Sequence, residues 1–291
     1  FSSMEGSSMS KAHSITVAVL LSFGASAPAL AADVLETPQA DAPKISGYVE
    51  GYLAGVNWSQ GRQSDTDFGY GGAARINVPF NERWNAQGDL AGDWINVKSE
   101  DATIGMYSAA LHGYWRDPGS FAVGAFANWQ GTSFDGEMSD LYAIMAGPEA
   151  QVYIDNVTLY GQAYFGQLRS KSSGDQNGTW GVRGVARYYV QPNIRLSAEA
   201  AYFSVDIGSG INTVAFAAQG DYRFDNSPVS VFGRYQFENL SVAGTSFAFD
   251  SHKLSVGLRL AFGTNTLLDE DRSGATMDIF RSNVAANFAV D

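Results

Sequence analysis

Apolar residues alternate with small, polar or charged residues through most of this chain. In the stretch KLSVGLRLAFG at 253–263, Leu254, Val256 and Leu258 fall on one side, opposite small or charged residues. A period of two indicates a β-strand with one apolar face. Similar segments, without any exact repeat, occur at 45–58, 67–80, 83–97, 103–116, 120–133, 140–154, 157–169, 178–190, 193–205, 212–225, 228–239 and 250–262.

The connections between these segments alternate in length. FNER, RDPGS, IDNV, VQPN and FDNSP are tight and contain the Asn, Asp, Pro and Gly residues that favour turn dihedrals. The connections SQGRQSD, TSFDGEMSD, RSKSSGDQNG, VDIGSG and ENLSVAGTSFAFDS are longer and polar, whereas KSEDA is short. With an even number of strands, this alternation predicts an antiparallel sheet whose two ends lie on the same side.

Two all-β architectures fit so many short strands, a soluble sandwich and a closed barrel in a membrane. The face opposite the apolar one is rich in Gly, Ala, Ser and Arg, unlike the lysine-bearing exterior expected of a sandwich. Aromatic residues beside the tight turns fit an interfacial girdle, and they are Phe80, Trp115, Tyr153, Tyr188, Phe224 and Phe262. Because a sheet in lipid must pair every backbone group, it has to close on itself. We therefore expect a closed antiparallel transmembrane β-barrel of about twelve strands, with short periplasmic turns and longer extracellular loops.

Composition and the first residues place the protein outside the cytoplasm. The net charge of −12 argues against a nucleic-acid partner, and the 291 residues include no Cys, which excludes disulfides and thiolate chemistry. Lys11, the apolar run ITVAVLLSFGA and the small residues APALAA follow in the order of a secretory signal peptide. We expect upstream residues and signal peptide at 1–32, a linker at 33–44, the barrel at 45–263, and a periplasmic C-terminal tail at 264–291, either free or folded back toward the lumen.

The last strand carries a more specific motif. Ser255, Gly257, Leu260 and Phe262 show a polar residue, a glycine two positions later, and then hydrophobic and aromatic residues. In this motif and in its strand and turn pattern, the chain resembles porin-like outer-membrane β-barrel proteins of Gram-negative bacteria. The resemblance implies the bacterial outer membrane as the location, outer-membrane lipid as a partner, and recognition of these four residues by the barrel assembly machinery. The chain differs from the usual pattern because residues 263–291 follow Phe262.

Charged residues share the face opposite the apolar one. An Arg on the lipid face at mid-depth costs about 2–4 kcal/mol, so these residues are expected inside the barrel. The predicted pore-lining residues are Glu50, Arg75, Asp89, Asp93, His112, Glu149, Arg183, Arg187, Arg195, Glu199, Asp221, Arg223, Arg234 and Arg259, and Arg116 and Glu238 have the same phase.

Most of the acids in this set precede most of the arginines along the chain. In a closed barrel they would form facing acidic and basic walls, which is how a channel constriction selects charged solutes. Alternatively, the charges pair across neighbouring strands and hold the barrel together. The pairs expected on that reading are Arg195 with Glu199, Asp221 with Arg223, and Glu50 with Arg259.

The function that follows is a channel for passive diffusion of small hydrophilic solutes, without a cofactor. The alternatives are a structural or surface-exposed barrel without an open pore, and a lipid-acting hydrolase. The hydrolase is disfavoured because Ser108 and His112 are separated by about 13 Å along a strand. No metal is expected either, since Asp269, Asp271 and Ser273 resemble a calcium loop that has Phe280 in place of its bidentate Glu.

Overall fold

The computed structural model describes residues 44–61, 63–98 and 101–283. The predicted signal peptide and nearly all of the predicted linker lie outside the described residues. The strands are β1 Ser46–Gln60, β2 Gln63–Pro79, β3 Trp84–Val97, β4 Ala102–Asp117, β5 Phe121–Phe134, β6 Glu137–Ile154, β7 Val157–Ser170, β8 Gln176–Gln191, β9 Ile194–Val205, β10 Ile211–Arg223, β11 Val229–Val242 and β12 Ala248–Phe262.

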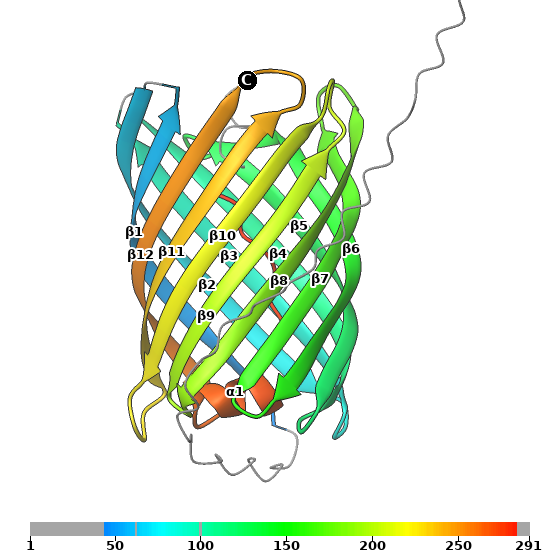
Figure 1. Ribbon diagram of the computed structural model, residues 1–291, viewed down its shortest axis with the longest axis vertical. Coiled ribbons are helices and arrows are strands. Elements are labelled where there is room, and N and C mark those ends of the chain that lie inside the picture. The colour runs from blue at the N-terminus through cyan, green and yellow to red at the C-terminus, as the bar shows by residue number, and fades with distance from the viewer. Residues whose placement is uncertain (1–43, 62, 99–100, 284–291) are drawn as a thin grey trace, which may run out of the picture. The chain divides into compact units, whose positions relative to one another are not determined.

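These strands form one closed barrel, as the sequence predicted. Each strand pairs antiparallel with its neighbours in sequence, and β1 pairs with β12 to complete the ring (Figure 1). At this closing seam Glu50 lies opposite Arg259 and Tyr52 lies opposite Gly257. A closed ring leaves no strand edge unpaired, which is the condition for a sheet to span lipid.

Connections at one end of the barrel, here called the turn end, are those predicted to be tight. At the opposite end, here called the loop end, the strands extend into the polar connecting segments. Asp135 and Gly136 close one of these hairpins with φ values of 47° and 85°. Positive φ at both central positions is typical of a type I′ turn, which matches the twist of the two strands it joins.

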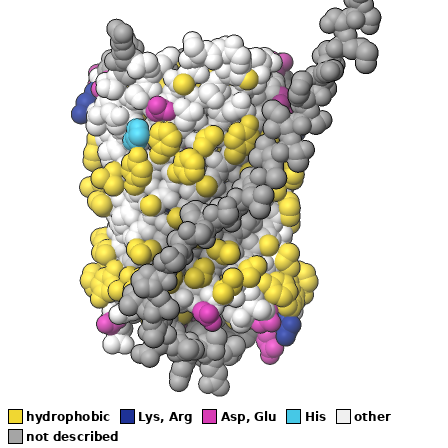
Figure 2. All heavy atoms as spheres, viewed as in Figure 1, with side chains coloured by type: hydrophobic (Ala, Val, Ile, Leu, Met, Phe, Trp, Pro, Cys, Tyr) yellow, Lys and Arg dark blue, Asp and Glu magenta, His cyan; other side chains and the backbone are white. Residues whose placement is uncertain are grey.

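Hydrophobic side chains gather on the outer surface between the two ends of the barrel, as the face in Figure 2 shows. Leu90, Leu111 and Leu258 are 63%, 72% and 59% exposed, although each lies within a strand. A charged or polar neighbour of each, Asp89, His112 and Arg259 respectively, is buried inside, as the period of two requires. An exposed apolar band of this kind is the surface that lipid tails would cover.

The aromatic residues near the turn end do not all face outward. Phe80, Tyr188, Phe224 and Phe262 are exposed on the outer surface, and Trp115 is half-buried. The prediction is wrong for Tyr153, which is buried inside the barrel, where its hydroxyl donates to Gln151 Oε1 at 3.0 Å. Tyr153 follows Gln151 by two positions and therefore shares its inward face, so strand parity decides its direction and proximity to a turn does not.

The chain turns back into the barrel after β12. Gly263 has φ of 79°, and a Cβ there would lie 2.3 Å from the carbonyl oxygen of Ile45, so only glycine fits this turn. Helix α1, Leu267–Ser273, follows, with the Thr266 hydroxyl accepting from the Asp269 N–H as its N-cap. Helix α1 is the one helix in the described part of the chain. No helix among the described residues is long and apolar enough to cross a membrane.

Residues 274–283 leave α1 at the turn end and continue inside the barrel (Figure 1). We call residues 264–283 the lumenal segment. It is the described part of the chain beyond Gly263, and its contacts with the inner wall determine how much of the lumen is free.

Candidate functional site in the barrel lumen

The residues predicted to line the lumen have their side chains inside the barrel. All of them are buried except Glu50, Arg75 and Arg234, which are half-buried as whole residues, although the Glu50 side chain itself is only 3% exposed. The buried members of the set are Asp89, Asp93, His112, Glu149, Arg183, Arg187, Arg195, Glu199, Asp221, Arg223 and Arg259. Lys253, which the sequence analysis did not include, also lies inside, with Nζ 2.5 Å from Asp93 Oδ1.

Many of these charges pair across neighbouring strands. Arg75 on β2 donates through Nε and Nη2 to both carboxylate oxygens of Asp89 on β3, at 2.9–3.1 Å. The expected pair of Glu50 and Arg259 is confirmed, at 2.8 Å across the closing seam. Each of these pairs joins strands that are hydrogen-bonded neighbours, so it stabilises the barrel wall as well as charging the lumen.

Two expected pairs are wrong. Arg195 pairs with Asp221 at 3.1 Å and not with Glu199, because the β9–β10 register places Arg195 directly opposite Asp221. Glu199 lies four positions further along the same strand, a separation of about 13 Å. Asp221 does not pair with Arg223, which instead reaches Glu270 of α1.

His112 lies between two carboxylates of the inner wall. Its Nδ1 is 2.9 Å from Glu149 Oε1, and its Nε2 is 3.7 Å from Asp89 Oδ2. The ring therefore connects the acids of β3 and β6. The other described histidine, His252, is partly exposed, with Nδ1 2.7 Å from the hydroxyl of Tyr235 on the outer surface.

The arginines of the second half of the barrel are balanced by carboxylates of the wall and of the lumenal segment together. On the wall, Arg195 pairs with Asp221 and Arg234 pairs with Glu199. Arg187 Nη1 lies 2.7 Å from Asp271 Oδ1, and its Nη2 lies 3.0 Å from Asp278 Oδ2. Arg183 also binds Asp278. The predicted acidic wall is therefore not the main partner of these arginines, because most of their carboxylate partners lie on neighbouring strands or in the lumenal segment.

Backbone groups of the lumenal segment are also bound by the wall. Gln87 donates from Nε2 to the carbonyl of Met277 at 2.7 Å and accepts from the Met277 N–H at 3.2 Å. The Phe280 N–H donates to the Tyr164 hydroxyl at 3.1 Å. The Asn283 N–H donates to Glu238 Oε1 at 2.6 Å. An extended backbone in a barrel needs such partners, because it has no strand beside it.

Apolar side chains of the segment pack on aromatic residues of the wall. Met277 is fully buried in a cluster with Tyr114, Tyr153 and Tyr160. The ring of Phe280 stacks on that of Phe203, with centroids 5.0 Å apart. Fully burying a side chain of this size stabilises a structure by about 1.5–3 kcal/mol, so apolar packing adds to the ion pairs in holding the segment.

Asp278 remains ionised in this environment. Burial of its carboxyl favours the neutral form, but the guanidinium groups of Arg183 and Arg187 outweigh that effect. The pKa of Asp278 therefore lies well below its usual range.

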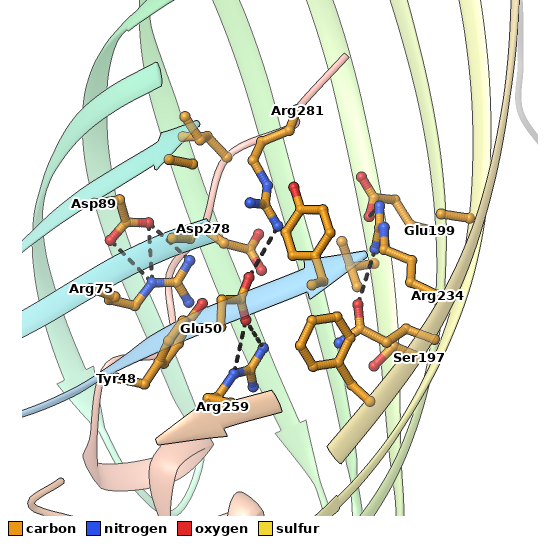
Figure 3. Close-up of a pocket in the computed structure, with 18 of the residues that line it drawn as sticks. Tyr48, Glu50, Arg75, Asp89, Ser197, Glu199, Arg234, Arg259, Asp278 and Arg281 are labelled. Atoms are coloured by element: carbon orange, nitrogen blue, oxygen red, sulfur yellow. Dashed lines mark hydrogen bonds and ion pairs between the residues drawn. The ribbon is translucent and has the colours of Figure 1, made fainter. Parts of the chain in front are cut away.

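Space remains beside the segment. A polar cavity of about 120 Å³ lies between the segment and the wall, lined by Tyr48, Glu50, Arg75, Arg234 and Asp278 among others (Figure 3). A second cavity of about 130 Å³ is more apolar and is lined by residues of β3 to β10 and by Phe280. The segment therefore divides the lumen and does not fill it.

Comparison with known proteins bears on the fold. No protein-family model matches the chain, and no curated protein matches it. An outer membrane channel from Pseudomonas putida F1 is similar in structure, with a TM-score of 0.51 at 11% identity over 79% of this chain and 100% of that one. The β domain of the Bordetella autotransporter BrkA, with a TM-score of 0.48 at 11% identity, matches 76% of this chain and 100% of its own.

The chain has the fold of an outer-membrane β-barrel. A further match is the translocator domain of the autotransporter NalP from Neisseria meningitidis, with a TM-score of 0.44, 15% identity, and coverage of 76% of this chain and 90% of that one. At these identities the likeness concerns the fold alone. Evidence about the function of this outer-membrane barrel has to come from the residues of its own lumen.

The lumenal segment is the part of the site that sequence reasoning did not place. Its acids were visible in the sequence as Glu270, Asp271 and Asp278, and so was the excess of arginines in the later strands. Matching those two charge sets would have indicated that the tail folds inward. The incomplete calcium motif has a different role, because Asp271 binds Arg187 and Thr158, and the described residues contain no group of three acidic or His side chains arranged for a metal.

Proposed function

We propose that this protein is a channel of the bacterial outer membrane for small hydrophilic solutes, narrowed by its own lumenal segment. The observation that carries the proposal is the polar cavity beside the segment, with charged side chains from both halves of the barrel in its lining. Water and small polar solutes are compatible with such a lining, whereas an apolar core would exclude them. The proposed role is not enzymatic.

The exterior supports the proposed location and partners. The apolar outer band suits outer-membrane lipid, and the predicted signal peptide and the absence of Cys from the sequence suit a protein assembled outside the cytoplasm. We include the barrel assembly machinery as a partner through Ser255, Gly257, Leu260 and Phe262. Of these, Gly257 also has a local role, because a Cβ there would lie 2.5 Å from the Phe232 ring.

A structural barrel without a pore is the second candidate. It is favoured by the ion pairs and buried apolar side chains that hold the segment in the lumen. The two candidates differ in whether ions cross the folded full chain.

Conductance in planar lipid bilayers tests the channel. We expect the folded full chain to give discrete, small unitary steps, and Arg234→Gln to change the ratio of cation to anion permeability because Arg234 lines the polar cavity. Ser172→Ala, at an exposed site of the loop end, is the matched control and should leave both values unchanged. If the folded full chain gives no steps in lipid, the channel proposal fails and the structural barrel is favoured.

A further inference from the structure

Arg187 has no carboxylate partner on the part of the barrel wall that the structure describes. Among the described residues, its hydrogen bonds and ion pairs go to Asp271, Thr276 and Asp278, all in the lumenal segment. Its side chain is only 5% exposed. A buried guanidinium without a counter-ion is costly, so the docked segment supplies the anions that Arg187 needs.

Asp278 bridges the guanidinium groups of Arg183 and Arg187. Its Oδ1 binds Nη1 of Arg183 and its Oδ2 lies 3.0 Å from Nη2 of Arg187. The side chain of Asp278 is 27% exposed, toward the polar cavity, while those of Arg183 and Arg187 are 4% and 5% exposed. The two arginines are thus fixed in the wall, and the carboxylate between them is the exposed and exchangeable partner.

Wall residues hold Arg183 independently of Asp278. Arg183 is also held by Glu199, which accepts from Nε at 2.7 Å, and by Gln162, which accepts from Nη1 at 2.8 Å. These contacts come from β7 and β9, on either side of the strand that carries both arginines. Planar guanidinium groups suit carboxylates because they offer two parallel donors.

We propose that Arg183 and Arg187 form a binding site for a small solute that carries a carboxylate, and that Asp278 occupies this site as an internal substitute. The inference names a substrate class for the channel proposed above and rests on that function for the route by which the solute arrives. Solute and segment cannot hold both arginines together, so each displaces the other. A solute that binds only when the segment has left shifts the equilibrium toward the released state.

Cysteine labelling measures this release without measuring conductance. The chain has no native Cys, so Ile279→Cys introduces one thiol, at a position 8% exposed beside Asp278. A polyethylene-glycol maleimide should modify it only when the segment leaves the lumen. In the folded full chain, succinate should raise the labelling rate in a saturable way, by about tenfold at ten times its dissociation constant for the released state. Sodium chloride at equal ionic strength and the neutral analogue succinamide should not.

Two variants distinguish solute binding at the arginines from weaker docking of the lumenal segment. With Ile279→Cys present, Asp278→Asn should label faster without succinate and should need less succinate for half of its effect, since the internal competitor is gone. Arg187→Gln should also label faster but should lose the response to succinate. A Cys at exposed Ser172 is the control for thiol reactivity and should label at one rate throughout.

Two results would overturn the inference. One is equal acceleration by succinate and by chloride at matched ionic strength, which would mean screening alone. The other is an unchanged succinate response in Arg187→Gln. Neither result depends on ion flow. The channel proposal can therefore fail in the bilayer experiment while the labelling experiment supports the anion site, and the labelling experiment can fail while the bilayer experiment supports the channel.

Discussion

A chain shortened to end at Gly263 is expected to form the same barrel and to conduct ions several-fold better than the full chain. The hydrogen-bonded ring is complete within residues 46–262, so the barrel wall does not need the lumenal segment to close. Removing the segment removes the side chains that separate the polar cavity from the apolar one, and it uncovers Arg187 and Arg223 in the lumen. Unitary conductance in planar bilayers measures the change, and the reversal potential in a salt gradient should move toward anion preference.

The control for this experiment lies in the same segment. Asn265 is exposed at the turn end, and Asn265→Ala in the full chain should conduct as the unmodified protein does. Heat-modifiable migration on gels should show that the shortened chain has folded. Equal conductance of the folded shortened chain and the full chain would mean that the segment does not limit the passage.

Charge reversal at Arg187 is expected to release the lumenal segment. Arg187→Glu replaces two ion pairs, at 2.7 and 3.0 Å, by three carboxylates in one buried place. Breaking one buried pair costs about 3–5 kcal/mol. Since each 1.4 kcal/mol changes an equilibrium tenfold, the ratio of docked to released segment should fall by roughly two to four orders of magnitude.

Trypsin reports this release through a site within the segment. Arg272 is 5% exposed at the end of α1 in the docked segment, so the bond after it should resist cleavage in the unmodified barrel. In Arg187→Glu that bond should be cut quickly, and mass spectrometry should detect the barrel ending at Arg272. Arg234→Gln is the matched control, because the contacts of Arg234 are with Glu199, Gln219 and Gln236 of the wall. Cleavage of Arg187→Glu at the unmodified rate would contradict the role assigned to these ion pairs.

The barrel could be predicted from the sequence because its signal is local. A period of two decides for each residue whether it faces lipid or lumen, and this holds for Arg75 and Leu90 alike without knowledge of any distant contact. The same parity would have corrected Tyr153, which proximity to a turn had placed on the outer surface. Lys253 also has the inward phase and could have been included in the lumen.

The pairing of lumenal charges could not be predicted in the same way. Arg195 and Asp221 meet because of the strand register, which depends on the connection between β9 and β10. The lumenal segment has no period of two, and its ion pairs join residues far apart in sequence, such as Arg187 and Asp271. Asp278 carries no local sign of its partners. Such contacts follow from the closed barrel and become visible only when its interior is known.

Amide hydrogen exchange of residues 274–283 tests most directly that the chain's own C-terminal segment occupies the lumen. The N–H groups of Met277, Phe280 and Asn283 donate to Gln87, Tyr164 and Glu238 of the wall. In the folded full chain in lipid, peptides from this segment should exchange orders of magnitude more slowly than a free peptide of the same sequence, and Arg187→Glu should remove the protection. Exchange of the unmodified protein at the rate of the free peptide would contradict a docked segment.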